Sequence, residues 1–552
     1  MKKWAVLILM SSATLIIVID TTIMNVSISD LVADLGTTVG GIQSAISLYA
    51  LVMAAFMLTG GKLGEIIGTR LTFTIGLVVF GVGTTIASFS QNLAMLIIGW
   101  SVLEGLGSAL MMPNIQTVLR SRYEGSDRAL SYGVVSAVAA VGAALGPIVG
   151  GAFTTYASWR WAFRLEVLIV IAVLIFIGAL PKDRLSAARP RFDFAGATLA
   201  AGGFALVVLG VLFIQDYGLL VAKQPLEVAG AEIAPFGISV VPFIVGIGAL
   251  LVLGLFVYER GREARSDPGL FRPSLLKTPG LLPGLTVRLI QYAVMAATLF
   301  TIPLLFQLTF EYTAIQTGVA MLPFSFGVLV LAVGGARLSA KLEARRMIQV
   351  GFIVAVAGLG ALLASVQPDV SSAEIATGAL LGAGIGLISS QILNLVLSRV
   401  SAADTAEIAG VNGTFEQLGN ALGVALVGTV MIVTVSQGVA EGVGASDAIP
   451  GEIKAEVVAA AEAGVQLLSD TDLDTVLTDA GIGSETRAEI EEIYADERTR
   501  GFRAAVIFLM FISVGGLLVA LMLPRGKLVG GGDDDQTHET GLPGAPPSAM
   551  AD

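Results

Sequence analysis

Acidic side chains interrupt long apolar runs of this 552-residue chain at Asp20, Glu104, Glu166 and Glu416. A charged side chain within hydrocarbon costs roughly 3 kcal/mol on insertion scales, so each of these positions calls for a partner, a proton or a function. Removal from water favours the neutral form of a carboxyl group, and such a group can bind and release a proton. Carboxyl groups at these positions could therefore carry protons across an apolar barrier.

Asp20 is the leading candidate for the proton-binding residue. It lies in the pattern D-x-T-x-x-N, where Thr22 and Asn25 offer hydrogen-bonding groups nearby. A charged Asp20 would also attract a lipophilic cation. The alternative is a structural Asp20 that is permanently protonated or hydrogen-bonded.

Glu416 is the second candidate, because it belongs to a polar stripe. Asn412, Glu416 and Asn420 are spaced by four residues and therefore share one face of a helix. A polar stripe in an apolar helix is expected to face a central cavity. The alternative is again a structural carboxyl group. Arg288, six residues inside its apolar run, either extends its side chain to the membrane surface or pairs with an acid.

The remaining two acids have different expectations. Glu104 either titrates or is structural. Glu166 has Arg160 and Arg164 close by in the sequence, so we expect a local ion pair among these residues.

Several function classes are excluded by composition. The chain has no Cys, and its one His, His538, lies in a polar tail, so we expect no metal site, no cofactor and no Ser-His-Asp catalysis. The pattern G-x-x-x-x-G-K-[ST] is absent, so ATP is not expected to drive any process in this chain. The net charge of −11 is local, since residues 441–497 hold fifteen acids against two bases, and no nucleic-acid partner is expected. The sequence does not indicate an enzyme.

The composition indicates a membrane protein. Hydrophobic residues make up 55% and charged residues 14% of the chain, whereas soluble proteins have about 25% charged residues. Because a span needs about 20 apolar residues, the sequence predicts an all-α integral membrane protein of about fourteen helices. The expected spans are 4–28, 41–61, 71–90, 94–118, 130–154, 161–180, 193–214, 235–257, 282–309, 315–337, 346–366, 374–397, 405–436 and 503–524.

The orientation follows from Lys and Arg. Alternate connections and the termini carry 23 basic residues, whereas the short loops of the opposite set carry only Arg160 and Lys223. We therefore expect both termini in the cytoplasm, with the protein in the cell membrane.

Four regions are expected along the chain. Residues 1–180 form an N-terminal six-helix half, 181–281 hold two extra spans with linkers, and 282–527 form a C-terminal six-helix half. Residues 437–500 of the last region are expected to be an external loop with a short helical hairpin. Residues 528–552, rich in Gly, Pro and Asp, are expected to be a disordered cytoplasmic tail.

The N-terminal half contains two glycine motifs. The turn G-K-L-G-E-I-I-G-T-R runs from Gly61 to Arg70, and a weaker copy runs from Ala336 to Arg345, which suggests two related halves. Within the turn, Gly61 and Gly68 permit tight geometry, and Glu65 can pair with a basic loop residue. The fifth span carries a side-chain-free stripe for close helix contact and a kinking proline, formed by Gly142, Gly146, Pro147, Gly150 and Gly151.

The chain also contains I-D-T-T-I-M-N-V-S at Ile19–Ser27 and E-G-L-G-S-A at Glu104–Ala109. Together with the two glycine motifs, these segments resemble the major facilitator superfamily, specifically its fourteen-span drug:proton antiporters. The resemblance implies two six-helix halves with two extra central spans. It associates the G-P-x-x-G-G motif with antiporters, and it makes the turn with Gly61, Glu65, Gly68 and Arg70 a cytoplasmic latch. This chain departs from the family pattern where Glu65 replaces Asp and Ile66 replaces Arg. It also has Glu104 in place of Gln and Ser101 in place of Arg.

The sequence thus favours a proton-coupled antiporter that exports small lipophilic or cationic compounds by alternating access. Its expected partners are the substrate, protons and membrane lipids, and a monomer is favoured although the sequence leaves the oligomeric state open. Candidate liners of an apolar cavity are Met111, Met112, Phe300, Phe306 and Phe324. Alternatives are an exporter of an endogenous lipid, glycolipid or secondary metabolite and, more remotely, a non-transporting membrane sensor or scaffold.

Overall fold

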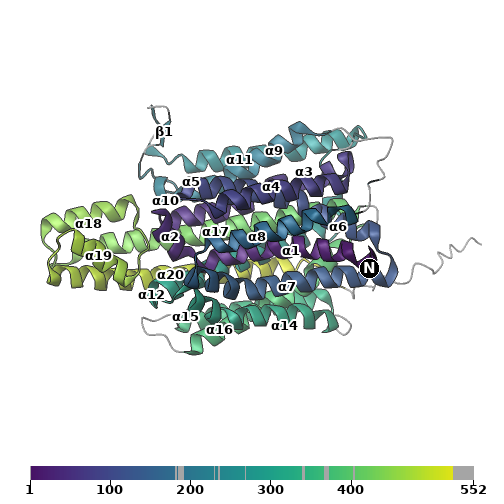
Figure 1. The fold of residues 1–552 in the computed structure, drawn as a ribbon. Helices are drawn as coiled ribbons and strands as arrows, with labels where there is room; N and C mark the ends of the chain where they lie inside the picture. Colours follow the sequence, from purple (N-terminus) through teal and green to yellow (C-terminus); the bar gives the residue numbers. More distant parts are fainter. Residues whose placement is uncertain are drawn as a thin grey trace, which may run out of the picture.

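The computed structural model describes residues 2–180, 183, 192–224, 226–228, 231–233, 237–267, 269–338, 342–365, 372–401 and 404–525. Its long helices lie roughly parallel in one bundle, and two short helices project from one end (Figure 1). The N-terminus lies at the other end, which we call the basic side because it carries the Lys- and Arg-rich connections. The expected tail at 528–552 lies outside the described residues.

The first half of the chain is helical throughout its described length. Its elements are α1 Lys2–Val26, α2 Ile28–Leu35, α3 Val39–Ile67, α4 Thr69–Ser88, α5 Leu93–Leu96, the π-helix η1 Ile97–Glu104, α6 Gly105–Arg122, α7 Gly125–Tyr156, α8 Arg160–Ile175 and the short 3₁₀ helix η2 Ile177–Ala179. Polar caps set several boundaries. For example, Thr38 accepts a hydrogen bond from the backbone N–H of Gly41 at 3.0 Å, which satisfies one donor at the start of α3.

The middle of the chain supplies two further long helices. Its elements are α9 Phe194–Leu212, α10 Ile214–Tyr217, β1 Leu226–Val228, β2 Ala231–Ile233, α11 Val241–Ala264 and the 3₁₀ helix η4 Pro273–Lys277. The antiparallel hairpin β1–β2 was not expected from the sequence. Helix α11 begins six residues later than the predicted span at 235, and Pro242 occupies its first turn.

The C-terminal part contains α12 Leu281–Thr309, α13 Ala314–Ala320, α14 Leu322–Leu338, α15 Ala344–Ser365, α16 Ser372–Leu397, α17 Thr405–Ala445, α18 Gly451–Gly464, α19 Asp470–Asp479 and α20 Ser484–Ala520. Among the described residues, thirteen helices are long and apolar enough to cross a membrane. The remaining span of the fourteen predicted is α8, whose 16 residues are followed by η2. The predicted all-α membrane fold is therefore confirmed.

The two short helices expected at 437–500 are present as α18 and α19, but they belong to a larger unit. Helices α17 and α20 continue beyond the membrane-spanning bundle and pack with α18 and α19, so the four helices form a small bundle that we call the distal bundle (Figure 1). Its core contains Val443, Leu473 and Tyr494. The apolar residues among the acids provide this core, which a lone hairpin would leave in water.

The distal bundle is tied to the connection between α12 and α13. Glu311 accepts a hydrogen bond from the backbone N–H of Thr471 at 2.9 Å, in the first turn of α19. Hydrogen bonds from Thr471 lower the pKa of Glu311. A carboxylate at a helix N-terminus also interacts favourably with the helix dipole.

The two sides of the bundle can be distinguished by cysteine labelling. We expect Ser266→Cys, on the basic side after α11, to react only from the cytoplasm. Ala480→Cys, after α19, should react only from outside. The natural chain has no Cys, so an impermeant maleimide on intact cells gives a clean readout. Labelling of Ser266→Cys from outside would contradict the orientation inferred from Lys and Arg.

Candidate functional site

Three of the four carboxyl groups within apolar runs meet at one place. Asp20 on α1, Glu104 on η1 and Glu166 on α8 place carboxylate oxygens within 4.8 Å of one another, and we call them the carboxyl cluster. Their exposed fractions are 1%, 0% and 2%. The cluster lies inside the N-terminal half and is enclosed by helices that are far apart in the sequence.

The π-helix η1 forms one wall of the cluster. Trp100 in η1 donates its indole N–H to Asp20 Oδ1 at 2.8 Å, and Ser101 donates its hydroxyl to the backbone carbonyl of Ala45 at 2.8 Å. Glu104 is the last residue of this segment. Short π-helical segments inside α-helices occur frequently at functional sites. Here the segment presents Trp100 and Glu104 to the same buried site.

Hydrogen bonds satisfy only part of the cluster. Thr84 on α4 donates to Glu166 Oε2 at 3.0 Å, whereas Asp20 Oδ2 and both oxygens of Glu104 have no hydrogen-bond partner. Among the described residues, no Lys or Arg forms an ion pair with the cluster. Two negative charges 4.8 Å apart repel by about 3.5 kcal/mol at an effective dielectric constant of ~20. The three groups therefore cannot all be ionised while they are enclosed without a counter-ion.

The expected ion pair of Glu166 with Arg160 or Arg164 is wrong. Arg160 pairs with Asp34, and the guanidinium of Arg164 lies 4.7 Å from the ring centre of Trp161. Residues two apart point to nearly opposite faces of a helix, and residues six apart are also poorly aligned. Glu166 therefore faces the protein interior while both arginines occupy other faces of α8.

Thr22 and Asn25 do not contact the Asp20 carboxyl group through the hydrogen bonds of the structure. Thr22 donates to the carbonyl of Val18 at 3.0 Å, and Asn25 donates to the carbonyl of Thr21 at 2.7 Å. Both side chains thus bond to the backbone of their own helix. The residues that surround Asp20 come instead from α3 and η1, where Tyr49 and Trp100 stack with ring centres 5.3 Å apart.

The fourth carboxyl group belongs to a separate buried site in the C-terminal half. Arg288 on α12 forms an ion pair with Glu416 on α17, with side chains 8% and 9% exposed. Asn412 donates to Glu416 Oε1 at 2.7 Å, and Arg288 donates to Gln291 at 3.2 Å. Asn420 bonds to Gln417 instead. Of the predicted polar stripe, Asn412 and Glu416 therefore interact with each other and face α12, whereas Asn420 does not join them.

Removal of one partner of this pair should destabilise the protein strongly. We expect Arg288→Ala to cost about 3–5 kcal/mol, because it leaves Glu416 buried without its counter-charge. The double variant Arg288→Met, Glu416→Leu should lose less. Lys62→Ala is a suitable control, since Lys62 pairs with the exposed Glu65 and such pairs contribute at most about 1 kcal/mol. Thermal unfolding in detergent measures all three, and equal losses for Arg288→Ala and Lys62→Ala would contradict the assignment.

The glycine stripe of α7 packs against α1. A Cβ at Gly142 would lie 3.2 Å from Leu15, one at Gly150 would lie 2.9 Å from Ile23 Cα, and one at Gly146 would overlap Thr22. Ser27, which directly follows α1, also hydrogen-bonds Thr154 on α7 at 2.7 Å. The missing side chains are what allow these two helices to approach so closely.

The end of the same stripe contacts the C-terminal half. A Cβ at Gly151 would overlap the backbone carbonyl of Ala314 on α13, and one at Gly318 on α13 would overlap the carbonyl of Pro147. Thr155 accepts a hydrogen bond from the backbone N–H of Ile315 at 3.0 Å. These contacts close the two halves against each other on the side of the distal bundle, and we call them the distal gate.

Two glutamines join the halves on that side as well. Gln307 on α12 donates to the carbonyl of Val26 at 3.0 Å, and Gln43 on α3 donates to the carbonyls of Val424 and Ala425 on α17 at 3.3 and 3.1 Å. Gln215, from α10, donates to Gln43 at 3.0 Å. The sequence analysis missed these residues, because a single glutamine near a span end carries no recognisable spacing.

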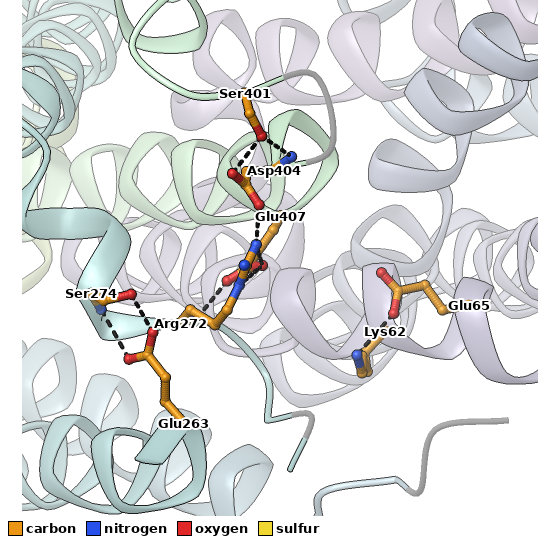
Figure 2. A network of polar contacts seen from close by, with 8 residues as sticks. All are labelled: Lys62, Glu65, Glu263, Arg272, Ser274, Ser401, Asp404 and Glu407. Atoms are coloured by element: carbon orange, nitrogen blue, oxygen red, sulfur yellow. Dashed lines mark hydrogen bonds and ion pairs between the residues drawn. The ribbon is translucent and has the colours of Figure 1, made fainter. Parts of the chain in front are cut away.

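On the basic side the halves stand apart around a cavity of about 1350 Å³. Its lining includes Lys62, Glu65 and Arg70 from the N-terminal half, Glu263 from the end of α11, Arg272 from the connection after α11, and Glu407 from α17. Figure 2 shows Lys62 with Glu65, and separately Arg272 with Asp404 and Glu407. The ion pairs of Lys62 and of Arg272 thus lie on separate walls of the cavity.

The proposed latch turn has one glycine that its geometry requires. Gly68 has φ +103°, and a Cβ there would overlap Asp183, whose carboxylate accepts a hydrogen bond from the backbone N–H of Arg70. A Cβ at Gly61 would meet Pro113 at an ordinary 3.6 Å, so the expectation that Gly61 is needed for tight geometry is wrong. The copy of this turn at 336–345 lies partly outside the described residues.

The expected apolar liners do not line this cavity. Its walls include none of Met111, Met112, Phe300, Phe306 and Phe324. Met111 and Phe300 are fully buried in the apolar core, where they pack against neighbouring helices. Phe306 and Phe324 instead line a separate apolar pocket of about 20 Å³. Hydrophobicity alone did not distinguish these positions from core positions.

Comparison with known proteins places the fold and its two-sided arrangement in a family. The model for the Major Facilitator Superfamily matches residues 10–424. This chain belongs to the major facilitator superfamily. The cephamycin export protein of Amycolatopsis lactamdurans is 31% identical over 435 residues, covering 77% of this chain and 84% of that protein. The puromycin resistance protein of Streptomyces alboniger is 27% identical over 438 residues, covering 78% and 82%.

Solved structures share the superfamily fold at low sequence identity. A bacterial homologue of the human lysosomal transporter Spinster has a TM-score of 0.56 at 13% identity, with 95% of this chain and 98% of that chain covered. A proton-dependent oligopeptide transporter gives 0.53 at 16% identity, with 94% and 99% covered. This superfamily member is therefore a multi-pass membrane transporter and not an enzyme.

Proposed function

We propose that this chain is a proton-coupled antiporter of the cell membrane that exports small lipophilic or cationic organic molecules by alternating access. The observation that carries the proposal is the carboxyl cluster, which is enclosed, has no basic partner among the described residues and therefore binds protons. Asp20 belongs to this cluster, and its helix α1 packs against the glycine stripe that leads to the distal gate. Helix α1 thus carries one member of the cluster and packs against α7, the helix that forms the gate.

The direction of transport follows from the positions of the cavity and the gate. The basic side is assigned to the cytoplasm by the Lys and Arg distribution, and the cavity opens on that side. The distal gate is closed on the other side. In this state the cavity receives substrate from the cytoplasm, and release requires separation of α7 from α13.

The substrate class is proposed from two observations. The cavity wall carries acids and bases together with apolar residues such as Leu58 and Phe271, a surface suited to amphipathic molecules. The relatives are named for puromycin resistance, cephamycin export, actinorhodin transport and tetracenomycin C resistance and export. These names also favour a second candidate cargo, which is a secondary metabolite of the producing cell.

The energy of the proton gradient is sufficient for such export. One proton that crosses about 150 mV releases roughly 3.5 kcal/mol. At about 1.4 kcal/mol per tenfold, this energy supports a substrate gradient of a few hundredfold.

The test is transport in proteoliposomes under an imposed pH gradient. Tetraphenylphosphonium, ethidium and puromycin are suitable probes of the cationic and amphipathic classes. We expect probe movement against its gradient, with counter-movement of protons, only when the pH gradient is present. Probe movement that is indifferent to the pH gradient would refute proton coupling. A lack of movement for every probe in a broad panel would refute the proposed substrate class.

A further inference from the structure

We propose that Asp20, Glu104 and Glu166 act as one unit that exchanges two protons in each transport cycle, with Glu166 as a third coupling residue. This inference rests on the proposed function and deepens it, because a single titrating aspartate would exchange one proton. The sequence favoured a local ion pair for Glu166 over a coupling role, because Arg160 and Arg164 are its neighbours.

The charge that the enclosed cluster tolerates sets the number of protons. Carboxylate oxygens from three helices lie within 4.8 Å of one another, and no Lys or Arg of the described residues pairs with them. Such a site accommodates at most one negative charge in a low dielectric. Three carboxyl groups with one charge hold two protons.

The hydrogen-bond donors indicate where the remaining charge lies. Trp100 donates to Asp20, and Thr84 donates to Glu166, so either of these carboxylates is stabilised by a donor. Glu104 receives no hydrogen bond at either oxygen. A buried carboxylate without a donor is the costliest of the three to ionise. Glu104 is therefore protonated in this state, and the second proton is shared between Asp20 and Glu166.

No other titratable group substitutes for these three. The elements packed around the cluster are α1, α3, α4, α6, α7 and α8 with η1. Within the described residues, the further titratable group that faces the cluster is the phenol of Tyr49, which hydrogen-bonds Ser108 and interacts with Asp20 and Glu104. The arginines of α8 pair with Asp34 or stack on aromatic rings on other faces. A phenol without a basic partner does not supply the missing positive charge.

A route for exchange exists next to the cluster. Thr22, two residues after Asp20, sits directly against Gly146 of α7. Thr22 and Asp20 point to nearly opposite faces of α1, so movement of α1 with α7 would shift Asp20 relative to Trp100 on its other face. Once water reaches one of the three carboxyl groups, a protonated neighbour can pass its proton to the emptied one. The cluster thus takes up or releases both protons through one opening.

The competing occupant is a hard cation such as Na⁺, Mg²⁺ or Ca²⁺. The three carboxyl groups offer oxygen ligands of the type these ions prefer. A bound cation would replace the protons. Protonated and cation-bound carboxyl groups can therefore be told apart by one measurement of carboxyl protonation.

That measurement is infrared spectroscopy of the purified full-length protein, in which protonated carboxyl groups give a separate C=O band that shifts in D₂O. We expect the intensity titrated by raising the pH to fall about twofold in Glu166→Gln, because the two remaining acids share one proton. Glu104→Gln should give the same twofold loss. Glu485→Gln, at an exposed position of α20, should leave the titrated intensity unchanged. Unchanged intensity in Glu166→Gln would overturn the proposal, as would loss of the band when Na⁺, Mg²⁺ or Ca²⁺ is added at constant pH.

The second arm measures the coupling ratio in proteoliposomes with the membrane potential clamped at zero and tetraphenylphosphonium as the probe. Two coupled protons let a tenfold proton gradient sustain about a hundredfold probe gradient, and one proton sustains about tenfold. We expect the first result for the natural chain and the second for Glu166→Gln. Tenfold for both proteins would overturn the two-proton unit while proton coupling stands. A probe gradient that ignores the proton gradient would instead refute the proposed function, and the infrared result would still decide the occupancy of the cluster.

Discussion

We expect Asp20→Asn to abolish proton-driven export while the protein stays folded. The amide has nearly the same shape as the carboxyl group, and its oxygen still accepts the indole N–H of Trp100. It cannot titrate, so transport driven by a pH gradient should fall by about two orders of magnitude or more, as expected when a group essential to proton transfer is removed. The measurement is initial-rate efflux from proteoliposomes under an imposed pH gradient.

Binding provides the control for this variant. The Asn side chain resembles protonated Asp20, so a neutral probe should still bind, whereas a cationic probe should bind more weakly because a nearby charge is lost. Glu416→Gln should have a separable defect, since Glu416 pairs with Arg288 in the other half. Undiminished gradient-driven transport by Asp20→Asn would remove Asp20 from the mechanism and shift the assignment to Glu104 or Glu416.

We expect Gly151→Leu to prevent closure of the distal gate. Even a Cβ at this position would overlap the carbonyl of Ala314, so the larger side chain must force α7 and α13 apart. Overpacking typically costs 1–3 kcal/mol, which corresponds to about a 5- to 150-fold shift from the closed to the open gate. Transport should fall by a similar factor, because the cycle must pass through the closed state.

Gly133→Leu is the matched control on the same helix. Nothing lies within 4 Å of a Cβ at Gly133, so this variant carries the same substitution without the clash. Ala314→Cys, whose position is buried while the gate is closed, reports the gate directly through its accessibility to an impermeant reagent, which should rise in Gly151→Leu alone. Equal transport and equal accessibility in both glycine variants would show that α7 and α13 do not form the gate.

The helices were predictable because apolar runs of about 20 residues form spans almost independently of context. The contacts between them were not. Glu166 illustrates the limit, since its sequence neighbours are basic but the helix turns them to other faces and turns Glu166 toward α1 and η1. The long-range partners Trp100 and Thr84 carry no spacing signal that would place them beside Asp20 and Glu166.

The glycines of α7 show the same limit, because their close contacts were predicted but the partner helices were not. The stripe at Gly142–Gly151 was predicted to mediate close helix contact, and its contacts in the structure are close. Which helix each glycine meets was not predictable, since neighbouring residues of the stripe contact different halves of the protein. The charged side chains of the distal bundle likewise concealed a packed core, because acids on the outer face dominate the local composition.

Helix α17 is continuous for 41 residues, from Thr405 past the Glu416 ion pair to the distal bundle. At 1.5 Å per residue it is a rod about 60 Å long, and a tilt of about 5° around its middle would displace each end by roughly 2–3 Å. Gly428 on this rod packs against Gln43 of the opposite half, and Glu311 ties the bundle at its tip to the helix that closes the gate. We therefore expect the distal bundle to move with α17 during the transport cycle. A fluorophore or antibody fragment attached to the bundle would report this movement without entering the transport path.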